Sequence, residues 1–165
     1  MNYNSAYLDD KDARIVDGVP VIGKTTERDM IFPDYKLLSV KIENNALREK
    51  LYNKEASVGC TFPRLIHPPA CVSTHAHVGS GVIELNNTVV RNNVGIGDGC
   101  ILNPGVEAHH DNTIGNYCLI NTNSVLHSLT HVGDRVWIGS TATVATNALV
   151  PDDTIIEDVE IYKAR

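Results

Sequence analysis

The chain has 165 residues, which is enough for one ordinary domain or for a small module joined to a repeat domain. Its formal net charge of −6, without any dense run of Lys or Arg, argues against nucleic acid or a membrane as a partner. No apolar stretch reaches the roughly 18 residues that span a bilayer, and Met1–Asp10 has no apolar signal core, so we expect a cytoplasmic protein.

The composition favours a narrow β architecture over packed helices. Apolar residues make up 42% of the chain but aromatic residues only 5%, and glycine, asparagine, threonine and valine are plentiful. This balance is typical of proteins with short strands and many tight turns.

The part of the chain before the repeats is predicted to form a small, partial α/β cap. Short strands are predicted at Ala6–Asp9 and Leu37–Ile42. Turns are predicted at Asp17-Gly18 and Gly23, on either side of the apolar Val19–Ile22.

A helix is predicted at Asn44–Asn53, with Asn44 or Asn45 as its N-cap. We expect the whole cap to shield the open edge of the first coil, because an unpaired strand edge invites pairing with another chain.

Aliphatic residues recur at every sixth position over most of the chain. The series comprises Ile66, Val72, Val78, Glu84, Val90, Ile96, Leu102, Ala108, Ile114, Ile120, Leu126, Val132, Ile138, Val144, Val150 and Ile156. Only Glu84 and Ala108 depart from Ile, Val or Leu, and residues two places earlier are nearly all small, with Asn112 the main exception. A short strand in each hexad would point the aliphatic side chain into a core, while the small residue allows a tight turn.

A second, longer period is superimposed on the first. Gly79, Gly97, Gly115 and Gly133 each follow a branched residue and recur at every third hexad, so three hexads make one coil. We expect these glycines to adopt backbone angles that other residues resist. Because the register never slips between 66 and 156, five coils should stack, rising roughly 24 Å at about 4.8 Å per coil.

This regularity predicts a parallel β-helix. An ordinary β-sandwich would instead show alternation of period two and turns about every 8 to 12 residues. The exact period of three hexads resembles the left-handed class of hexapeptide-repeat solenoids, which implies the rare left-handed crossover. We expect a partial α/β cap at 1–62, a left-handed β-helix at 63–156 and a C-terminal tail at 157–165.

The four cysteines, Cys60, Cys71, Cys100 and Cys118, have no C-x-x-C spacing, and the chain has no export signal. Neither a zinc site nor a disulfide framework is therefore predicted. We interpret the cysteines as small, buried apolar residues.

Histidines supply the candidate catalytic groups. His109 and His127 stand three hexads apart, so they should stack on adjacent coils, and His110 directly precedes Asp111. An imidazole beside a carboxylate can act as a general base near neutral pH, because the carboxylate fixes its tautomer and stabilises the imidazolium. A histidine on a solenoid is otherwise an ordinary surface residue.

A metal site is the alternative use of these histidines. The γ-class carbonic anhydrases hold zinc with two histidines separated by four positions and a third some two coils earlier. His127 and His131 have that separation, but His75 and His77 are not at an equivalent earlier position. A stacked pair of imidazoles could still bind a metal. We nevertheless expect no metal.

No motif of a serine hydrolase, a nucleotide hydrolase or a dehydrogenase occurs in the sequence. Acyl transfer requires less of a sequence: a base, a backbone N–H for the oxyanion and a groove for a thioester.

Leu102-Asn-Pro-Gly-Val-Glu-Ala-His-His-Asp-Asn-Thr-Ile-Gly115 resembles a segment of the bacterial sugar acetyltransferases, the group of sialic-acid O-acetyltransferases and bacillosamine or perosamine N-acetyltransferases. Phe62–Ser73 resembles that group's entry to the first coil, and Val136–Gly139 also matches. Tyr7–Asp10 and Gly18–Gly23 resemble the second half of its N-terminal nucleotide-sugar domain, which implies that this domain is truncated here.

The resemblance implies that His110 is the general base and Asp111 its orienting carboxylate, while Ser128 offers its backbone N–H to the oxyanion. It also implies that Gly139 and Ser140 line the groove for acetyl-CoA, and that Leu119 replaces a histidine that contacts substrate or coenzyme. The site would lie between the subunits of a homotrimer.

Three functions follow as hypotheses. The first is an acetyl-CoA-dependent acetyltransferase that acts on an amino sugar, free or nucleotide-linked, or on a related small amine or hydroxyl. The second is a trimeric scaffold that has lost coenzyme binding. The third, which the histidine spacing disfavours, is a metalloenzyme of the carbonic anhydrase type.

Overall fold

The structure is a computed structural model that describes residues 6–8, 15–16, 19–24, 27, 35 and 37–163. The chain separates into two compact units, residues 1–36 and residues 37–165. None of the helices described is long and apolar enough to cross a membrane.

The first unit contains a small sheet. Its strands β1 (Tyr7–Leu8), β2 (Ile15–Val16) and β3 (Val19–Gly23) have the order β1-β3-β2, with β1 parallel and β2 antiparallel to β3. The predicted first strand and the apolar segment that begins at residue 19 therefore both form strands. Gly23 ends β3 and does not form the predicted turn, and the turn predicted at Asp17-Gly18 lies outside the described residues.

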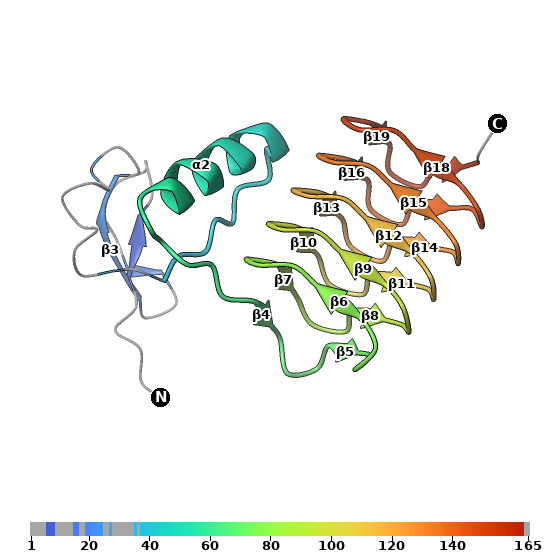
Figure 1. Cartoon of the computed structure of the whole chain (residues 1–165), viewed down its shortest axis with the longest axis horizontal. Coiled ribbons are helices and arrows are strands. Elements are labelled where there is room, and N and C mark those ends of the chain that lie inside the picture. Colours follow the sequence, from blue (N-terminus) through green and yellow to red (C-terminus); the bar gives the residue numbers. More distant parts are fainter. Residues whose placement is uncertain are drawn as a thin grey trace. The chain divides into compact units, whose positions relative to one another are not determined.

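The second unit contains the predicted solenoid, a left-handed parallel β-helix built from two-residue strands (Figure 1). The first sheet holds β4 (Leu65–Ile66), β7 (Ile83–Glu84), β10 (Ile101–Leu102), β13 (Leu119–Ile120), β16 (Trp137–Ile138) and β19 (Ile155–Ile156). The second holds β5 (Cys71–Val72), β8 (Val89–Val90), β11 (Glu107–Ala108), β14 (Val125–Leu126), β17 (Thr143–Val144) and β20 (Ile161–Tyr162). The third holds β6 (His77–Val78), β9 (Gly95–Ile96), β12 (Thr113–Ile114), β15 (His131–Val132) and β18 (Leu149–Val150).

Each strand pairs in parallel with the strand that follows three hexads later, so the predicted register is confirmed. Ile101 pairs with Leu119, for example, and Glu107 with Val125. The pairing continues past residue 156, because Ile161 of β20 pairs with Thr143 of β17. The residues beyond the last predicted hexad thus add a strand to the second sheet.

The sixfold series forms the core of this unit. From Val78 to Ile156 its aliphatic members are buried, and the small residues two places earlier pack between them. Glu84 belongs to the same column and is also fully buried, although neither of its carboxylate oxygens has a hydrogen-bond partner among the described residues. Asn112 is also buried, but its side chain is hydrogen-bonded: it donates to the Leu126 carbonyl and accepts from the Thr130 N–H.

The cysteines only partly match their interpretation. Cys60, Cys100 and Cys118 are buried, as expected, and all four are free thiols. Cys71 is exposed, so the interpretation is wrong for this residue. It directly precedes the inward-facing Val72 and therefore points to the outer face of its strand.

The glycines of the three-hexad period have a different role from the one predicted. Positive φ angles occur instead at the second residue after each, such as Gly99 and Tyr117. A Cβ atom on Gly97 would lie 2.7 Å from the carbonyl oxygen of Gly115 on the next coil. These positions therefore require glycine because adjacent coils approach closely, and the expectation about backbone angles is wrong.

Helix α2 (Asn45–Ser57) continues past the predicted end at Asn53, and Asn44 is its N-cap, accepting from the Leu47 N–H over 2.9 Å. Arg48 fastens this helix to the solenoid. Its buried guanidinium donates to the carbonyl oxygens of Gly99 and Tyr117, which lie at the same turn of adjacent coils. The ring of Tyr52 stacks on Phe62 with centroids 3.8 Å apart.

The predicted strand at Leu37–Ile42 is wrong. Only Leu37 forms an isolated bridge, to Thr61, and the rest of the segment has no regular structure. The Ile42 carbonyl accepts a hydrogen bond from Arg48 of α2, so this carbonyl is bonded to the helix and not to a neighbouring strand.

Candidate active site

The three sheets meet at three columns of turns, which we call corners. The histidine corner joins the second sheet to the third and comprises residues 73–75, 91–93, 109–111, 127–129 and 145–147. The Ser140 corner joins the first sheet to the second and includes residues 121–123, 139–141 and 157–159. The helix corner joins the third sheet to the first, where α2 lies.

His110 and Asp111 form a hydrogen-bonded pair on the histidine corner. His110 Nδ1 lies 2.8 Å from Asp111 Oδ2, and the imidazole is about half exposed, with 55% of its side-chain surface accessible. The hydrogen bond from His110 holds the pKa of Asp111 below its usual value, so this carboxyl is ionised near neutral pH. An ionised Asp111 can only accept a hydrogen bond, so it favours the imidazole tautomer that carries its proton on Nδ1 and leaves Nε2 as the basic nitrogen.

The backbone explains why adjacent residues make this contact. Asp111 has φ 61°, in the left-handed region that aspartate tolerates better than most residues. Asn93 occupies the same turn position one coil earlier, with φ 59°, and its Nδ2 donates to Asp111 Oδ1 over 3.0 Å. Asn93 was not among the predicted site residues, although its position three hexads before Asp111 is a signal that could have identified it.

Ser128 lies on the coil directly after His110 on the same corner. Its carbonyl accepts from the Asn147 N–H, but its own N–H has no acceptor among the residues that the structure describes. The equivalent N–H groups of Ser80, Asp98, Asn116 and Asp134 on the helix corner each donate to a side-chain oxygen of the next coil. The Ser128 N–H is therefore available to a ligand beside His110.

Gly139 and Ser140 lie on a different corner from His110 within one chain. Their main-chain N–H groups are already bonded, from Gly139 to the Ile156 carbonyl and from Ser140 to Asp158 Oδ1. The structure thus does not bring these two residues to His110, and a contact with coenzyme through their N–H groups would require Asp158 or Ile156 to release them.

Leu119 is also remote from His110. It lies on β13 of the first sheet, which does not border the histidine corner, and is 1% exposed in a cluster with Ile83 and Ile101. Its side chain is packed against these neighbours, and its role as a contact for the coenzyme stays a prediction.

His109 and His127 stack as predicted, with ring centroids 5.1 Å apart and an angle of 88° between the rings. His109 Nε2 lies 3.5 Å from Glu107 Oε2. Within the described part of the chain, no three His, Cys, Asp or Glu side chains are grouped so that they could hold a metal ion.

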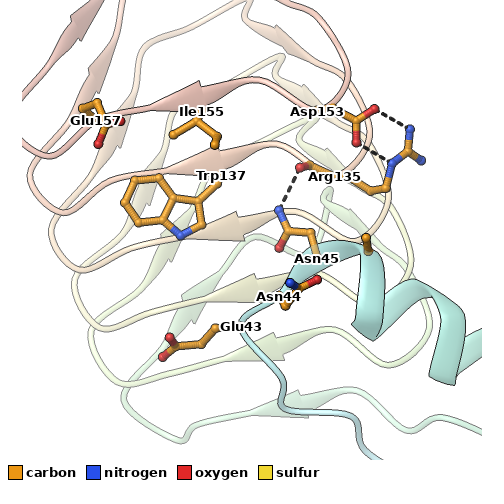
Figure 2. Close-up of a pocket in the computed structure, with 9 residues that line it drawn as sticks. Glu43, Asn44, Asn45, Arg135, Trp137, Asp153, Ile155 and Glu157 are labelled. Carbon is orange, nitrogen blue, oxygen red and sulfur yellow. Dashed lines mark hydrogen bonds and ion pairs between the residues drawn. The ribbon is translucent and has the colours of Figure 1, made fainter.

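An open groove of about 550 Å³ lies beside the start of α2, on the outer face of the first sheet (Figure 2). Trp137 and Ile155 from adjacent strands line it, together with Glu43 and the ion pair between Arg135 and Asp153. This sheet does not border the histidine corner, so within one chain the groove is separate from the pair of His110 and Asp111.

No profile of a known protein family matches the sequence. Several solved structures, however, are similar to this chain. The acetyltransferase domain of PglB from Neisseria gonorrhoeae FA1090 is 28% identical, with a TM-score of 0.92, over 96% of this chain and 78% of that chain. The same domain in complex with acetyl coenzyme A is 26% identical, with a TM-score of 0.71, over 94% and 83% of the two chains.

PerB from Caulobacter crescentus, solved in complex with CoA and GDP-perosamine, is 31% identical, with a TM-score of 0.84, over 91% of this chain and 75% of that chain. The likeness therefore covers nearly all of the sequence. The chain belongs to the hexapeptide-repeat sugar acetyltransferase family.

Proposed function

We propose that this chain transfers the acetyl group of acetyl-CoA to the amino group of a sugar, with His110 as general base. The observation that carries the proposal is the contact between His110 Nδ1 and Asp111 Oδ2, at 2.8 Å, on a corner where the next coil presents the unbonded N–H of Ser128. A base and an oxyanion donor one coil apart are the two protein groups that acyl transfer from a thioester needs.

The chemistry follows from these positions. The acceptor amine attacks the thioester carbonyl carbon while His110 Nε2 takes its proton, and the Ser128 N–H stabilises the oxyanion that forms. Collapse of the tetrahedral intermediate breaks the C–S bond, and the imidazolium returns the proton to the departing thiolate. Asp111 stabilises the imidazolium between these two proton transfers.

The assembly proposed for this reaction is a homotrimer. Ser140 lies at the opposite edge of the second sheet from His110, so a coenzyme that contacts the Ser140 corner and the His110 base would bridge two copies of the chain. Closed cyclic symmetry would give three equal sites between neighbouring copies.

The relatives support the acceptor class. PerB was solved with CoA and GDP-perosamine, and the PglB domain with acetyl coenzyme A. The His110 and Asp111 pair and the open Ser128 N–H favour an enzyme over the scaffold hypothesis.

The test records thiol release from acetyl-CoA with a panel of amino sugars, free and linked to nucleotides, for the wild type and His110→Ala. We expect turnover to fall by roughly two orders of magnitude or more in the variant, which is the usual loss for a general base. His131→Ala, an exposed histidine on β15, is the matched control and should retain wild-type turnover. Equal turnover of His110→Ala and wild type would remove His110 from the mechanism.

A second measurement addresses the scaffold hypothesis. Thermal stabilisation of the wild type by coenzyme A is expected, because a ligand that binds only the folded state raises its stability. If no acceptor gives thiol release and coenzyme A leaves the melting temperature unchanged, the chain is a scaffold.

A further inference from the structure

The last coil of the solenoid, at the C-terminal end in Figure 1, exposes two large apolar side chains beside the second sheet. Val159, on the Ser140 corner, is 74% exposed, and Ile161 of β20 is 62% exposed. The equivalent residues one coil below are the more polar Thr141 and Thr143. Neighbouring apolar residues that are exposed together mark a surface that contacts another molecule.

The backbone of Val159 points to the same conclusion. Its φ angle is 64°, in the left-handed region that β-branched residues avoid. Asn87, Gly105 and Asn123 occupy this turn position on lower coils, and these residue types accept a positive φ at little cost. Within one chain, the exposed Val159 gains no burial that would offset the strain, so we expect a contact outside the chain to cover it.

The last coil also separates its charges between the two corners that border the second sheet. Its turn on the Ser140 corner, residues 157–160, contains Glu157, Asp158 and Glu160 and no basic residue, and we call it the acidic turn. Lys163 is exposed and follows β20, where the histidine corner begins. Among the residues that the structure describes, neither the acidic turn nor Lys163 forms an ion pair. The two are complementary in charge but lie on different corners of one chain.

Glu157 is the member of the acidic turn whose carboxylate is free for a partner. Asp158 Oδ1 accepts from the Ser140 N–H over 2.6 Å, and Glu160 Oε2 accepts from the Glu157 N–H over 2.8 Å. The Glu157 carboxylate accepts no hydrogen bond from the described chain, and its side chain lines the groove shown in Figure 2. A substitution of Glu157 therefore changes the charge of the acidic turn without removing a side-chain bond of the fold.

The proposed homotrimer brings these two corners together. A coenzyme that bridges two copies needs the histidine corner of one copy beside the Ser140 corner of the next. In a ring of three triangular solenoids, two different corners of neighbouring copies meet when the sheet between these corners faces the threefold axis. The second sheet lies between them, whereas the helix corner is covered by α2 through Arg48 and Asn45. A rotation about an axis parallel to the solenoid keeps each coil at its own height, so the last coils of neighbouring copies meet.

We propose that the last coil forms the contact between copies: Lys163 of one copy pairs with the acidic turn of the next, and Val159 and Ile161 are buried beside this pair. The inference rests on the proposed function and identifies the surface through which the homotrimer associates. A second copy fits this surface because the same coil supplies both partners of the ion pair. End-to-end association through this coil would instead bring two acidic turns together, which like-charge repulsion opposes.

The first test measures the oligomeric state of the wild type and Lys163→Glu by sedimentation over a range of protein concentrations. We expect the wild type to be a trimer. In Lys163→Glu, the concentration at which half of the trimer dissociates should rise roughly tenfold or more, because the reversal places like charges at each interface. Glu157→Lys alone should have the same effect.

The double variant Lys163→Glu/Glu157→Lys restores opposite charges and should recover most of the affinity between copies. Lys50→Glu makes the same change of charge at an exposed position of α2, away from the last coil, and is the matched control. It should leave the assembly unchanged.

Val159→Asn tests the apolar part of the interface without disturbing the fold. Asn87 and Asn123 already occupy the equivalent turn position, so the variant should fold at least as well as the wild type. We expect its circular dichroism spectrum to be unchanged and the concentration of half-dissociation to rise roughly tenfold, the size of one valine side chain no longer buried at each interface.

Three results would overturn the inference. They are a wild type that stays monomeric at every concentration, a half-dissociation concentration that does not change in Val159→Asn or in Lys163→Glu, and a double variant that assembles no better than the single variants. Failure of the proposed function looks different. A trimer that responds to these variants as expected, but releases no thiol with any acceptor, would retain the interface and lose the acetyltransferase.

Discussion

Asn93 holds Asp111 from the coil beneath it: Nδ2 of the amide donates to Oδ1 of the carboxylate over 3.0 Å, while the other carboxylate oxygen contacts His110. Both residues occupy the left-handed position of their turns. The orientation of the proposed base is therefore fixed by two consecutive coils and does not depend on the His110 turn alone.

Replacing this amide should reduce catalysis without unfolding the protein. We expect Asn93→Ala to lower kcat roughly fivefold, the equivalent of one hydrogen bond of about 1 kcal/mol, because Asp111 loses one of its two partners. Asn87→Ala is the control, since Asn87 has φ 60° at another corner and makes no side-chain hydrogen bond that the structure shows. Steady-state kinetics measures kcat for both variants. An equal loss of kcat in the two would mean that Asn93 affects catalysis only through the backbone of its turn and not through its hydrogen bond to Asp111.

The oxyanion role of Ser128 can be tested by removing its N–H. Ser128→Pro should fold, because Pro68 and Pro104 already occupy the same turn position in other hexads. We expect kcat to fall about 10² to 10³-fold, as when an oxyanion donor is lost. Ser128→Ala keeps the N–H and should retain wild-type kcat. Retained activity in a folded Ser128→Pro protein would assign the oxyanion to another donor.

Glu84 should make the stability of the solenoid depend on pH. Burial raises the pKa of Glu84 to about 7, whereas the same carboxyl in an unfolded chain titrates near its ordinary value of about 4.3. The folded state therefore holds the proton more tightly. The stabilisation that this bound proton gives to the folded state is complete below the unfolded pKa and is lost as pH rises through the folded pKa, by at most about 4 kcal/mol.

Chemical denaturation of wild type and Glu84→Gln at about pH 5 and about pH 8 measures this difference. We expect the wild type to lose stability between the two conditions and the variant, which cannot ionise, to lose less. Parallel pH dependence in the two proteins would show that Glu84 is not the titrating group.

The glycine period predicts a sharp contrast between two neighbouring positions. A Cβ on Gly97 would lie within 2.7 Å of the Gly115 carbonyl on the next coil, whereas a Cβ on Gly95 would meet no atom within 4 Å. We expect Gly97→Ala to destabilise the protein by roughly 2 to 3 kcal/mol through overpacking, and Gly95→Ala to be neutral or slightly stabilising. Thermal or denaturant unfolding of both variants provides the comparison, and similar stabilities would contradict the steric explanation.

The sequence by itself determined the solenoid. Its core is made of one local pattern repeated at every sixth position, and each coil contacts only its neighbours, so the period of Ile, Val and Leu fixed both the strands and their register. It also determined which residues stack, such as His109 on His127, because a separation of three hexads places two side chains at the same corner of adjacent coils.

The tertiary structure decided what the period could not specify, namely the directions in which side chains outside the core point and what covers them. Leu119 is packed under its neighbours and Cys71 is exposed, although both belong to strands with the same local pattern. The segment at Leu37–Ile42 does not form the predicted strand, and its Ile42 carbonyl accepts a hydrogen bond from Arg48 of α2. The hydrogen bonds that leave the Ser128 N–H open and occupy that of Ser140 depend on the side chain that the next coil offers, which is a property of three-dimensional contact and not of spacing.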